Sequence, residues 1–155
     1  MGIQKDILSA MAVHAKKQTA SGEVEKLLVR HKISPTRQRR QIARILFARP
    51  QHLSAEQILK SVNHEGGNIV SKATVYNTLG LFVNKGLIRE VIVNSNKVFY
   101  DSNTAAHHHF YNVDTGMLQD VDFKHVSLNS VPIPPSGTEL DGVDIIVRVR
   151  SKANL

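Results

Sequence analysis

The stretch that decides the fold is SKATVYNTLGLFVNKGLIREVIVNSNKVFYD, residues 71–101. Its first half places apolar residues one helical turn apart, opens with serine and threonine residues that can cap a helix, and ends at Gly86. In its second half the apolar period becomes that of strands, on both sides of the turn Asn94-Ser95-Asn96. The stretch therefore predicts a helix over 71–85 followed by a β-hairpin over 87–101.

Further helices are expected upstream of this stretch. SGEVEKLLVRH (21–31) opens with a serine cap and early glutamates. SPTRQRRQIARILFARP (34–50) has Thr36 as its cap, and LSAEQILKSVNHEGG (53–67) begins at the cap Ser54 and ends at two glycines. Helices followed by a hairpin form the plan of a winged helix-turn-helix, whose last helix enters the major groove of DNA. The segment 71–85 is then the recognition helix, and 87–101 is the wing.

Charge is distributed unevenly along the chain. Residues 1–100 carry 16 Lys and Arg against 6 Asp and Glu, whereas residues 101–155 carry 4 against 7. Residues 26–49 hold eight basic residues and no acidic one. A basic half is typical of a polyanion-binding protein, whereas a merely solvated helix face usually mixes signs. The charge therefore favours nucleic acid, with an anionic membrane surface as the alternative.

Composition excludes several kinds of site. The chain has 155 residues and no cysteine, which excludes disulfides, cysteine nucleophiles and thiolate zinc sites. No apolar run approaches the ~20 residues of a membrane span, and the N-terminus lacks the apolar core of a secretory signal. Residues 1–20 are expected to be an N-terminal extension, either an extra amphipathic helix or a mobile segment.

Residues 102–155 are expected to form a second unit. HHHFYNV (107–113) and MLQDVDF (117–123) predict two strands joined by a turn, and VDIIVRVR (143–150) alternates like a third. Roughly fifty residues of strand cannot bury a core alone, so a second copy of the chain is expected to cover them. The predicted fold class is α+β, with a winged-helix DNA-binding domain over 21–101 and a small α/β dimerisation and sensor domain over 102–155.

The segments SPTRQR, QHLSAEQIL, KATVYNTL, NKGLI and HHHFYNVDTG stand in the order seen in the ferric uptake regulator family. The sequence resembles that family over roughly residues 24–123, and more weakly in the last strand. The missing cysteines and the run HHHFYNVDTG are most similar to its iron response regulator subgroup, whose members sense haem or iron status. The resemblance implies a transcription regulator, not an enzyme, that binds operator DNA as a homodimer.

The resemblance also implies DNA contacts. Thr74 and Tyr76 match family positions in the recognition helix, where the tyrosine contacts thymine methyl groups. Asn77 replaces a frequent arginine and can pair bidentately with adenine. The basic residues expected to position the phosphate backbone are Lys32, Arg37, Arg39, Arg40 and Lys72.

The family's sensor metal site is built from histidine and carboxylate ligands. The residues that match it are His52, Asp101, His107, His109 and Asp120. In a strand, His107 and His109 face the same side while His108 faces away. Nitrogen and oxygen ligands suit Fe(II), Mn(II) or Zn(II). Ligands from both domains would let metal occupancy set the angle between the domains.

The subgroup resemblance further implies haem binding through His107, His108 and His109, because imidazole is a common axial ligand of haem iron. Two other interpretations of this run are a solvated strand start and a structural metal site without sensing. The family's structural zinc site needs two pairs of cysteines, and the first pair falls on Asn112 and Thr115. No Cys-type structural zinc is therefore expected.

The leading interpretation is a dimeric regulator of iron and haem homeostasis in the bacterial cytoplasm. It would bind operator DNA under low iron, mostly as a repressor, and would be released by haem, with no membrane partner. The alternative is a repressor of the same family that responds to manganese or iron without haem. A remote alternative is a metallohydrolase that uses the His/Asp cluster, although no HExxH motif or glycine-rich phosphate loop accompanies it.

Overall fold

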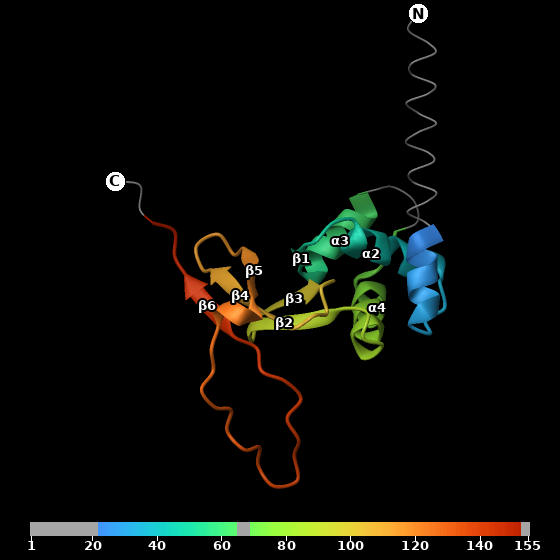
Figure 1. The fold of residues 1–155 in the computed structure, drawn as a ribbon. Coiled ribbons are helices and arrows are strands. Elements are labelled where there is room, and N and C mark those ends of the chain that lie inside the picture. Colours follow the sequence, from blue (N-terminus) through green and yellow to red (C-terminus); the bar gives the residue numbers. More distant parts are fainter. Residues whose placement is uncertain (1–21, 65–68, 153–155) are drawn as a thin grey trace, which may run out of the picture.

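The computed structural model describes residues 22–64 and 69–152. Residues 22–30 are helical, and they are followed by the helices α2 (Arg37–Phe47), α3 (Ala55–His64) and α4 (Lys72–Asn84). Figure 1 shows the helices at one end of the molecule and the C-terminal strands at the other, with β2 and β3 between them. The expected N-terminal extension over 1–20 and the helix end at Gly66-Gly67 lie outside the described residues.

The helices α2, α3 and α4 begin at capping residues that the sequence predicts. Thr36 caps α2, and the side chain of Ser71 caps α4 by accepting a hydrogen bond from the third residue of that helix. At the start of α3, Gln57 N donates to Ser54 Oγ at 3.2 Å and Ser54 N donates to Gln57 Oε1 at 2.9 Å. These contacts satisfy backbone donors that a first helical turn leaves open.

The main core lies between the helices. Its members include Leu28, Ile42, Ile58, Leu79 and Phe82, all fully buried. Leu87, Ile88 and Tyr100 from the segment 87–101 also belong to this core. Burial of this one face of α4 leaves the opposite face of the helix for solvent or a partner. None of the described helices has the length and apolar character needed to cross a membrane.

Gly86 connects α4 to the wing. Its φ of +67° is accessible to glycine without strain, and its N–H donates to Val83 O at 2.9 Å. The wing strands β2 (Arg89–Asn94) and β3 (Lys97–Asp101) then pair antiparallel, as predicted. A strand that was not predicted, β1 (His52–Leu53), pairs with the other edge of β3 and completes a sheet of order β1-β3-β2.

The C-terminal strands form a second sheet of order β5-β4-β6. The strand β4 (His107–Asn112) pairs antiparallel with β5 (Leu118–Asp122) and parallel with β6 (Ile146–Val149). The strand predicted over 143–150 is therefore too long. Its first residues are engaged elsewhere, since Asp144 forms an ion pair with Arg89 and the backbone N–H of Ile145 bonds the His108 side chain.

An apolar cluster joins the two sheets. It contains Val91, Val93 and Phe99 from the wing and Tyr111 from β4, so it extends across the predicted domain boundary after Asp101. Beyond the short helix η1 (Phe123–His125), residues 126–145 form a wide loop that projects away from both sheets (Figure 1). The fold is α+β, as predicted.

Candidate metal centre and DNA-binding face

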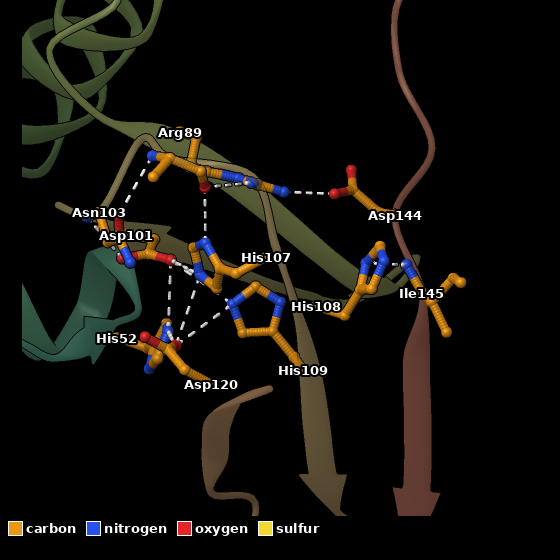
Figure 2. Close-up of polar contacts among 11 residues, drawn as sticks. His52, Arg89, Asp101, Asn103, His107, His108, His109, Asp120, Asp144 and Ile145 are labelled. Atoms are coloured by element: carbon orange, nitrogen blue, oxygen red, sulfur yellow. Dashed lines mark hydrogen bonds and ion pairs between the residues drawn. The ribbon is translucent and has the colours of Figure 1, made fainter. Parts of the chain in front are cut away.

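Five side chains from four strands meet between the two sheets. His52 comes from β1, Asp101 from the end of β3, His107 and His109 from β4, and Asp120 from β5. Each residue offers one ligand atom, and these atoms all lie within 4.8 Å of one another. The structure thus brings together all five residues that the resemblance singles out as metal ligands (Figure 2). We refer to them as the metal group.

Strand pairing explains why these residues converge. In the wing sheet His52 lies directly opposite Asp101, and in the C-terminal sheet His109 lies directly opposite Asp120. His107 stands two residues before His109 on β4, so both imidazoles face the same side. Each sheet therefore contributes a histidine and carboxylate pair, and the metal group exists only because the two sheets meet.

The two carboxylates lie among the three imidazoles. Asp101 Oδ2 is 2.8 Å from Nε2 of His107, 3.3 Å from that of His52 and 3.4 Å from that of His109. Asp120 Oδ1 is 2.7 Å, 3.4 Å and 3.6 Å from the Nε2 atoms of His52, His107 and His109. Ligands bound about 2.1 Å from one ion lie roughly 3 Å from one another. The distances between the carboxylates and the imidazoles are therefore compatible with binding to one ion.

Several of these polar atoms are buried without a hydrogen bond. Within the described part of the chain, Nε2 of His52 and both ring nitrogens of His109 have no hydrogen-bond partner. Carboxylate oxygens lie near the Nε2 atoms of His52 and His109, but outside hydrogen-bond geometry. Unpaired buried polar groups are costly, and a cation at the centre of the metal group would satisfy these two Nε2 atoms. Three nitrogens and two oxygens fit Fe(II), Mn(II) or Zn(II).

The charges in the metal group support each other. Burial alone would raise the pKa of Asp101, but His109, His52 and the backbone N–H of Asn103 outweigh it and hold that pKa well below its usual range. Burial alone would lower the pKa of His52, but Asp101 and Asp120 outweigh it and raise that pKa above its usual value. The carboxylates thus favour positive charge at this centre, whether from imidazolium or from a metal ion.

Backbone groups orient the side chains of His107 and Asp101 through hydrogen bonds on the side away from the centre of the metal group. Nδ1 of His107 donates a hydrogen bond to the carbonyl of Ala105 at 2.7 Å, which leaves Nε2 free to bind a metal ion. Asn103 N donates to Asp101 Oδ1 at 2.8 Å, so Oδ2 faces the centre. The sequence did not predict these partners, because a backbone carbonyl or amide leaves no trace in residue type.

His108 faces the other side of β4, as strand alternation predicts. Its Nδ1 accepts a hydrogen bond from Ile145 N at 3.4 Å, and the side chain is half-buried. The three histidines that the resemblance groups as haem ligands therefore do not converge on one point. His107 and His109 face the metal group, and His108 faces the segment before β6 (Figure 2).

An open cleft of about 1070 Å³ leads from solvent to the metal group. It lies between the connection of α2 to β1 and the turn of β4 to β5, and it reaches His52, Asp101 and Asp120. Asp120 is the exposed member of the metal group, with 46% of its side chain accessible, whereas His109 is 1% exposed. A small ion can thus enter from the Asp120 side.

The expected DNA-reading residues lie on the outer face of α4. Lys72, Tyr76 and Asn77 are exposed, and Thr74 is half-buried. The Tyr76 hydroxyl donates to Glu56 Oε1 at 2.8 Å, and Lys72 Nζ lies 5.6 Å from the centre of its ring. Tyr76 is therefore outside the core, as predicted, and is held by two neighbours, of which Glu56 was not predicted.

The basic residues expected to contact phosphates differ in their solvent exposure and in their hydrogen bonds within the protein. Lys32 and Arg37 are exposed, whereas Arg39 and Arg40 are half-buried. Arg39 Nη1 donates to a backbone carbonyl, Ser34 O, at 3.0 Å, and Arg40 Nη1 donates to Glu25 Oε2 at 3.4 Å. Lys32 and Arg37 are thus the more accessible pair.

Known proteins resemble this chain in sequence and in fold. Residues 31–144 match the Ferric uptake regulator family. The Peroxide-responsive repressor PerR of Staphylococcus aureus is 32% identical over 96 residues, which span 62% of this chain but only 63% of that protein. The structure of the ferric uptake regulator from Pseudomonas aeruginosa with manganese is 24% identical, with 81% of this chain and 96% of that chain covered and a TM-score of 0.59. A zinc-bound manganese uptake regulator is 21% identical, with 83% and 98% covered and a TM-score of 0.62. The chain therefore belongs to the ferric uptake regulator family of transcription regulators.

Proposed function

We propose that this protein is a dimeric repressor that binds operator DNA through α4 and responds to a divalent metal ion held by the metal group. The observation that carries the proposal is the convergence of five ligand atoms from both sheets on one point. Fe(II), Mn(II) and Zn(II) are the candidate ions. The family consists of transcription regulators, not enzymes, so the metallohydrolase alternative loses its support.

The position of the metal group suggests how an ion would act. His52 and Asp101 belong to the wing sheet, which is joined to α4 through Gly86, whereas His107, His109 and Asp120 belong to the C-terminal sheet. A bound ion would supply a positive charge that both sets of ligands share. It would thereby favour one arrangement of the wing relative to the C-terminal sheet, and that arrangement would be the one that binds DNA.

On DNA, α4 would lie in the major groove with Tyr76 against thymine methyl groups, Asn77 on adenine and Thr74 beside them. Lys32, Arg37, Arg39, Arg40 and Lys72 would bind phosphates, so affinity should fall steeply as salt rises. This assignment is supported by the exposure of Lys72, Tyr76 and Asn77 on one side of α4.

We infer that the protein acts in the bacterial cytoplasm as a homodimer, in which a second copy of the chain covers the C-terminal sheet. Large apolar side chains are exposed there, among them Phe110, Met117, Phe123 and Val147. Exposed apolar groups gathered on one part of a protein favour an interface, and a two-fold dimer would present two copies of α4 to two half-sites.

The test is operator binding with and without metal. Duplexes that bind the protein are selected from a randomised pool in Mn(II), and affinity for the selected duplex is then measured with Mn(II) or with a chelator. We expect Mn(II) to raise the affinity at least tenfold for the wild type and for His125→Ala, an exposed histidine on η1. His109→Ala should lose this response. Absence of sequence preference, or equal affinity in chelator and Mn(II), would contradict the proposal.

A second candidate effector is haem, in a regulator of iron and haem homeostasis that leaves its operator when haem binds. The resemblance to the iron response regulator subgroup supports it, together with the half-buried His108 on the face opposite the metal group. The same operator assay is repeated with haem and with hydrogen peroxide, for which the Staphylococcus aureus relative is named. Release by haem that His108→Ala abolishes would favour haem. Loss of operator binding in chelator, with no release by haem, would favour the metal.

A further inference from the structure

Arg89 lies at the junction of the wing and the C-terminal sheet. It is the first residue of β2 and stands directly opposite Asp101 of the metal group. One branch of its guanidinium, Nη1, donates to Ala105 O at 3.4 Å, and the other, Nη2, forms a close ion pair with Asp144. Figure 2 shows the Arg89 side chain extended toward Asp144.

One partner of Arg89 bonds the strand that carries the histidines, and the other partner precedes a residue that does. The Ala105 carbonyl also accepts from Nδ1 of His107 at 2.7 Å. Asp144 precedes Ile145, whose carbonyl accepts from His109 N at 3.1 Å and whose N–H donates to His108 Nδ1 at 3.4 Å. Arg89 therefore contacts groups that fix β4 from two sides.

A second contact joins β6 directly to β2, near the other end of β2. Arg148 Nη2 of β6 donates to Val93 O at 3.2 Å. Between these contacts, Val91 and Val93 of β2 pack in the apolar cluster that Ile146 of β6 also adjoins. The region around β6 is thus fastened to β2 by polar contacts at both ends and by apolar packing between them.

We propose that Arg89 is a positioning residue of the metal sensor. Through Ala105 O it holds His107 with Nε2 directed at the metal group, and through Asp144 it fastens the wing to the start of β6. This side chain adds a coupling between occupancy of the metal group and the position of the wing, beside the ion that both sheets would share. The proposal rests on the proposed metal-responsive function and assigns the residues that transmit the response.

Guanidinium chemistry explains why an arginine suits this place. A carbonyl oxygen has two lone pairs and can accept from His107 and Arg89 together. The planar guanidinium reaches two acceptors at fixed directions, which a single ammonium cannot do. Groups that orient a ligand histidine typically change metal affinity about 10- to 100-fold when they are removed.

The test compares Arg89→Ala and Asp144→Asn with the wild type and with Arg150→Ala. Arg150 is a matched control, because it forms an ion pair with Asp114 at 3.5 Å just beyond β6 and away from the metal group. Co(II) affinity and the shape of the Co(II) absorption bands are measured by titration. Amide hydrogen exchange over residues 89–94 and 144–149 is measured with chelator and with Co(II).

The two variants should separate the two parts of the proposal. Arg89→Ala should weaken Co(II) binding about tenfold or more and alter the absorption bands, which report ligand geometry rather than overall stability. Asp144→Asn should keep Co(II) affinity within about threefold, since the Ala105 contact remains. Both should speed amide exchange over 144–149 in metal-free protein, and both should lose the protection that Co(II) gives to 89–94.

Each part can be overturned separately. Co(II) affinity and bands of Arg89→Ala equal to those of Arg150→Ala would overturn the positioning of His107. Wild-type exchange over 144–149 in Asp144→Asn would overturn the fastening of the wing to β6. Failure of the wild type to bind Co(II) would instead overturn the proposed metal function and the positioning role with it, while exchange in metal-free protein would still decide the fastening.

Discussion

At the scale of the residue, Glu56 is an acidic side chain on the face that is proposed to meet DNA. The hydrogen bond from Tyr76 lowers the pKa of Glu56, and the same bond raises the pKa of Tyr76. Glu56 stays ionised and occupies the Tyr76 hydroxyl, so the ring carbons of Tyr76 remain for contact with DNA. The charge also repels phosphates that approach without the correct base contacts.

We therefore expect Glu56→Ala to reduce discrimination between specific and non-specific duplexes. Loss of the hydrogen bond frees the tyrosine side chain and should weaken binding to the specific duplex by about 1 kcal/mol, or roughly fivefold. Loss of the negative charge should strengthen binding to non-specific duplexes. A double-mutant cycle with Tyr76→Phe measures the coupling, and deoxyuridine in place of thymidine tests the methyl contact. Glu23→Ala, on an exposed residue of the helical segment 22–30, is the control. Additive effects of the two substitutions would show that the bond does not matter for DNA.

The metal group predicts opposite effects of pH on stability and on metal affinity. In metal-free protein the raised pKa of His52 contributes stability that is present below its ordinary value of 6.5 and is lost as pH rises through the raised pKa. Metal binding displaces protons from histidine, so metal affinity should rise over the same window. Urea unfolding in chelator and Co(II) titration, both between about pH 6 and 9, measure the two trends. A metal affinity that fell with rising pH would contradict this account.

The convergence of the metal group could be predicted, but the groups that orient its side chains could not. His52, Asp101, His107, His109 and Asp120 were identified from resemblance to family motifs, and strand alternation correctly turned His108 away. Ala105 contributes a carbonyl and Asn103 a backbone amide, which any residue type supplies. The part played by Arg89 depends on Asp144, 55 positions away, and no local pattern links them.

At the scale of the element, two glycines of the α4 region make a matched pair. Gly86 has a φ of +67°, whereas Gly80 lies inside the helix, and a Cβ added at either meets no atom within 4 Å. Gly86→Ala should destabilise the protein by about 1–2 kcal/mol, because only backbone strain is added. Gly80→Ala should stabilise it by about 0.5–1 kcal/mol through higher helix propensity. Urea unfolding measures the change in the free energy of unfolding for both variants. A change in the same direction for both would contradict the described end of α4.

Helices were easier to predict than the edge strands. The helices and the wing have caps, turns and apolar periods that belong to continuous segments. The strand β1 has only two residues, too few to show any period, and it forms because β3 offers an open edge. For β6, the alternation of apolar and polar residues over 143–150 indicated a strand. It could not show that Asp144 pairs with Arg89, so that the strand begins only at Ile146.

At the scale of the whole molecule, the basic half contains the helices that are proposed to bind DNA, and the acidic half contains the C-terminal sheet, which carries most of the proposed metal site. The C-terminal sheet places Phe110 directly opposite Val147, and both are exposed, at 38% and 37%. We expect Val147→Glu to weaken the dimer at least tenfold, because a charge would be buried in the interface. Ile92→Glu, on the exposed side of the wing, is the control. Sedimentation at several concentrations measures the change, and an unchanged dimer in Val147→Glu would place the interface elsewhere.

The most direct test of the central claim, that five residues from two sheets form one metal site, is a Co(II) titration of single alanine variants. The wild type should bind one equivalent of Co(II) at this site. Substitution of any one member of the metal group should weaken that binding by at least tenfold, about 1.4 kcal/mol, while His64→Ala, His108→Ala and His125→Ala should bind as the wild type does. Wild-type affinity in any of the five variants, or loss of binding in His108→Ala, would contradict the claim.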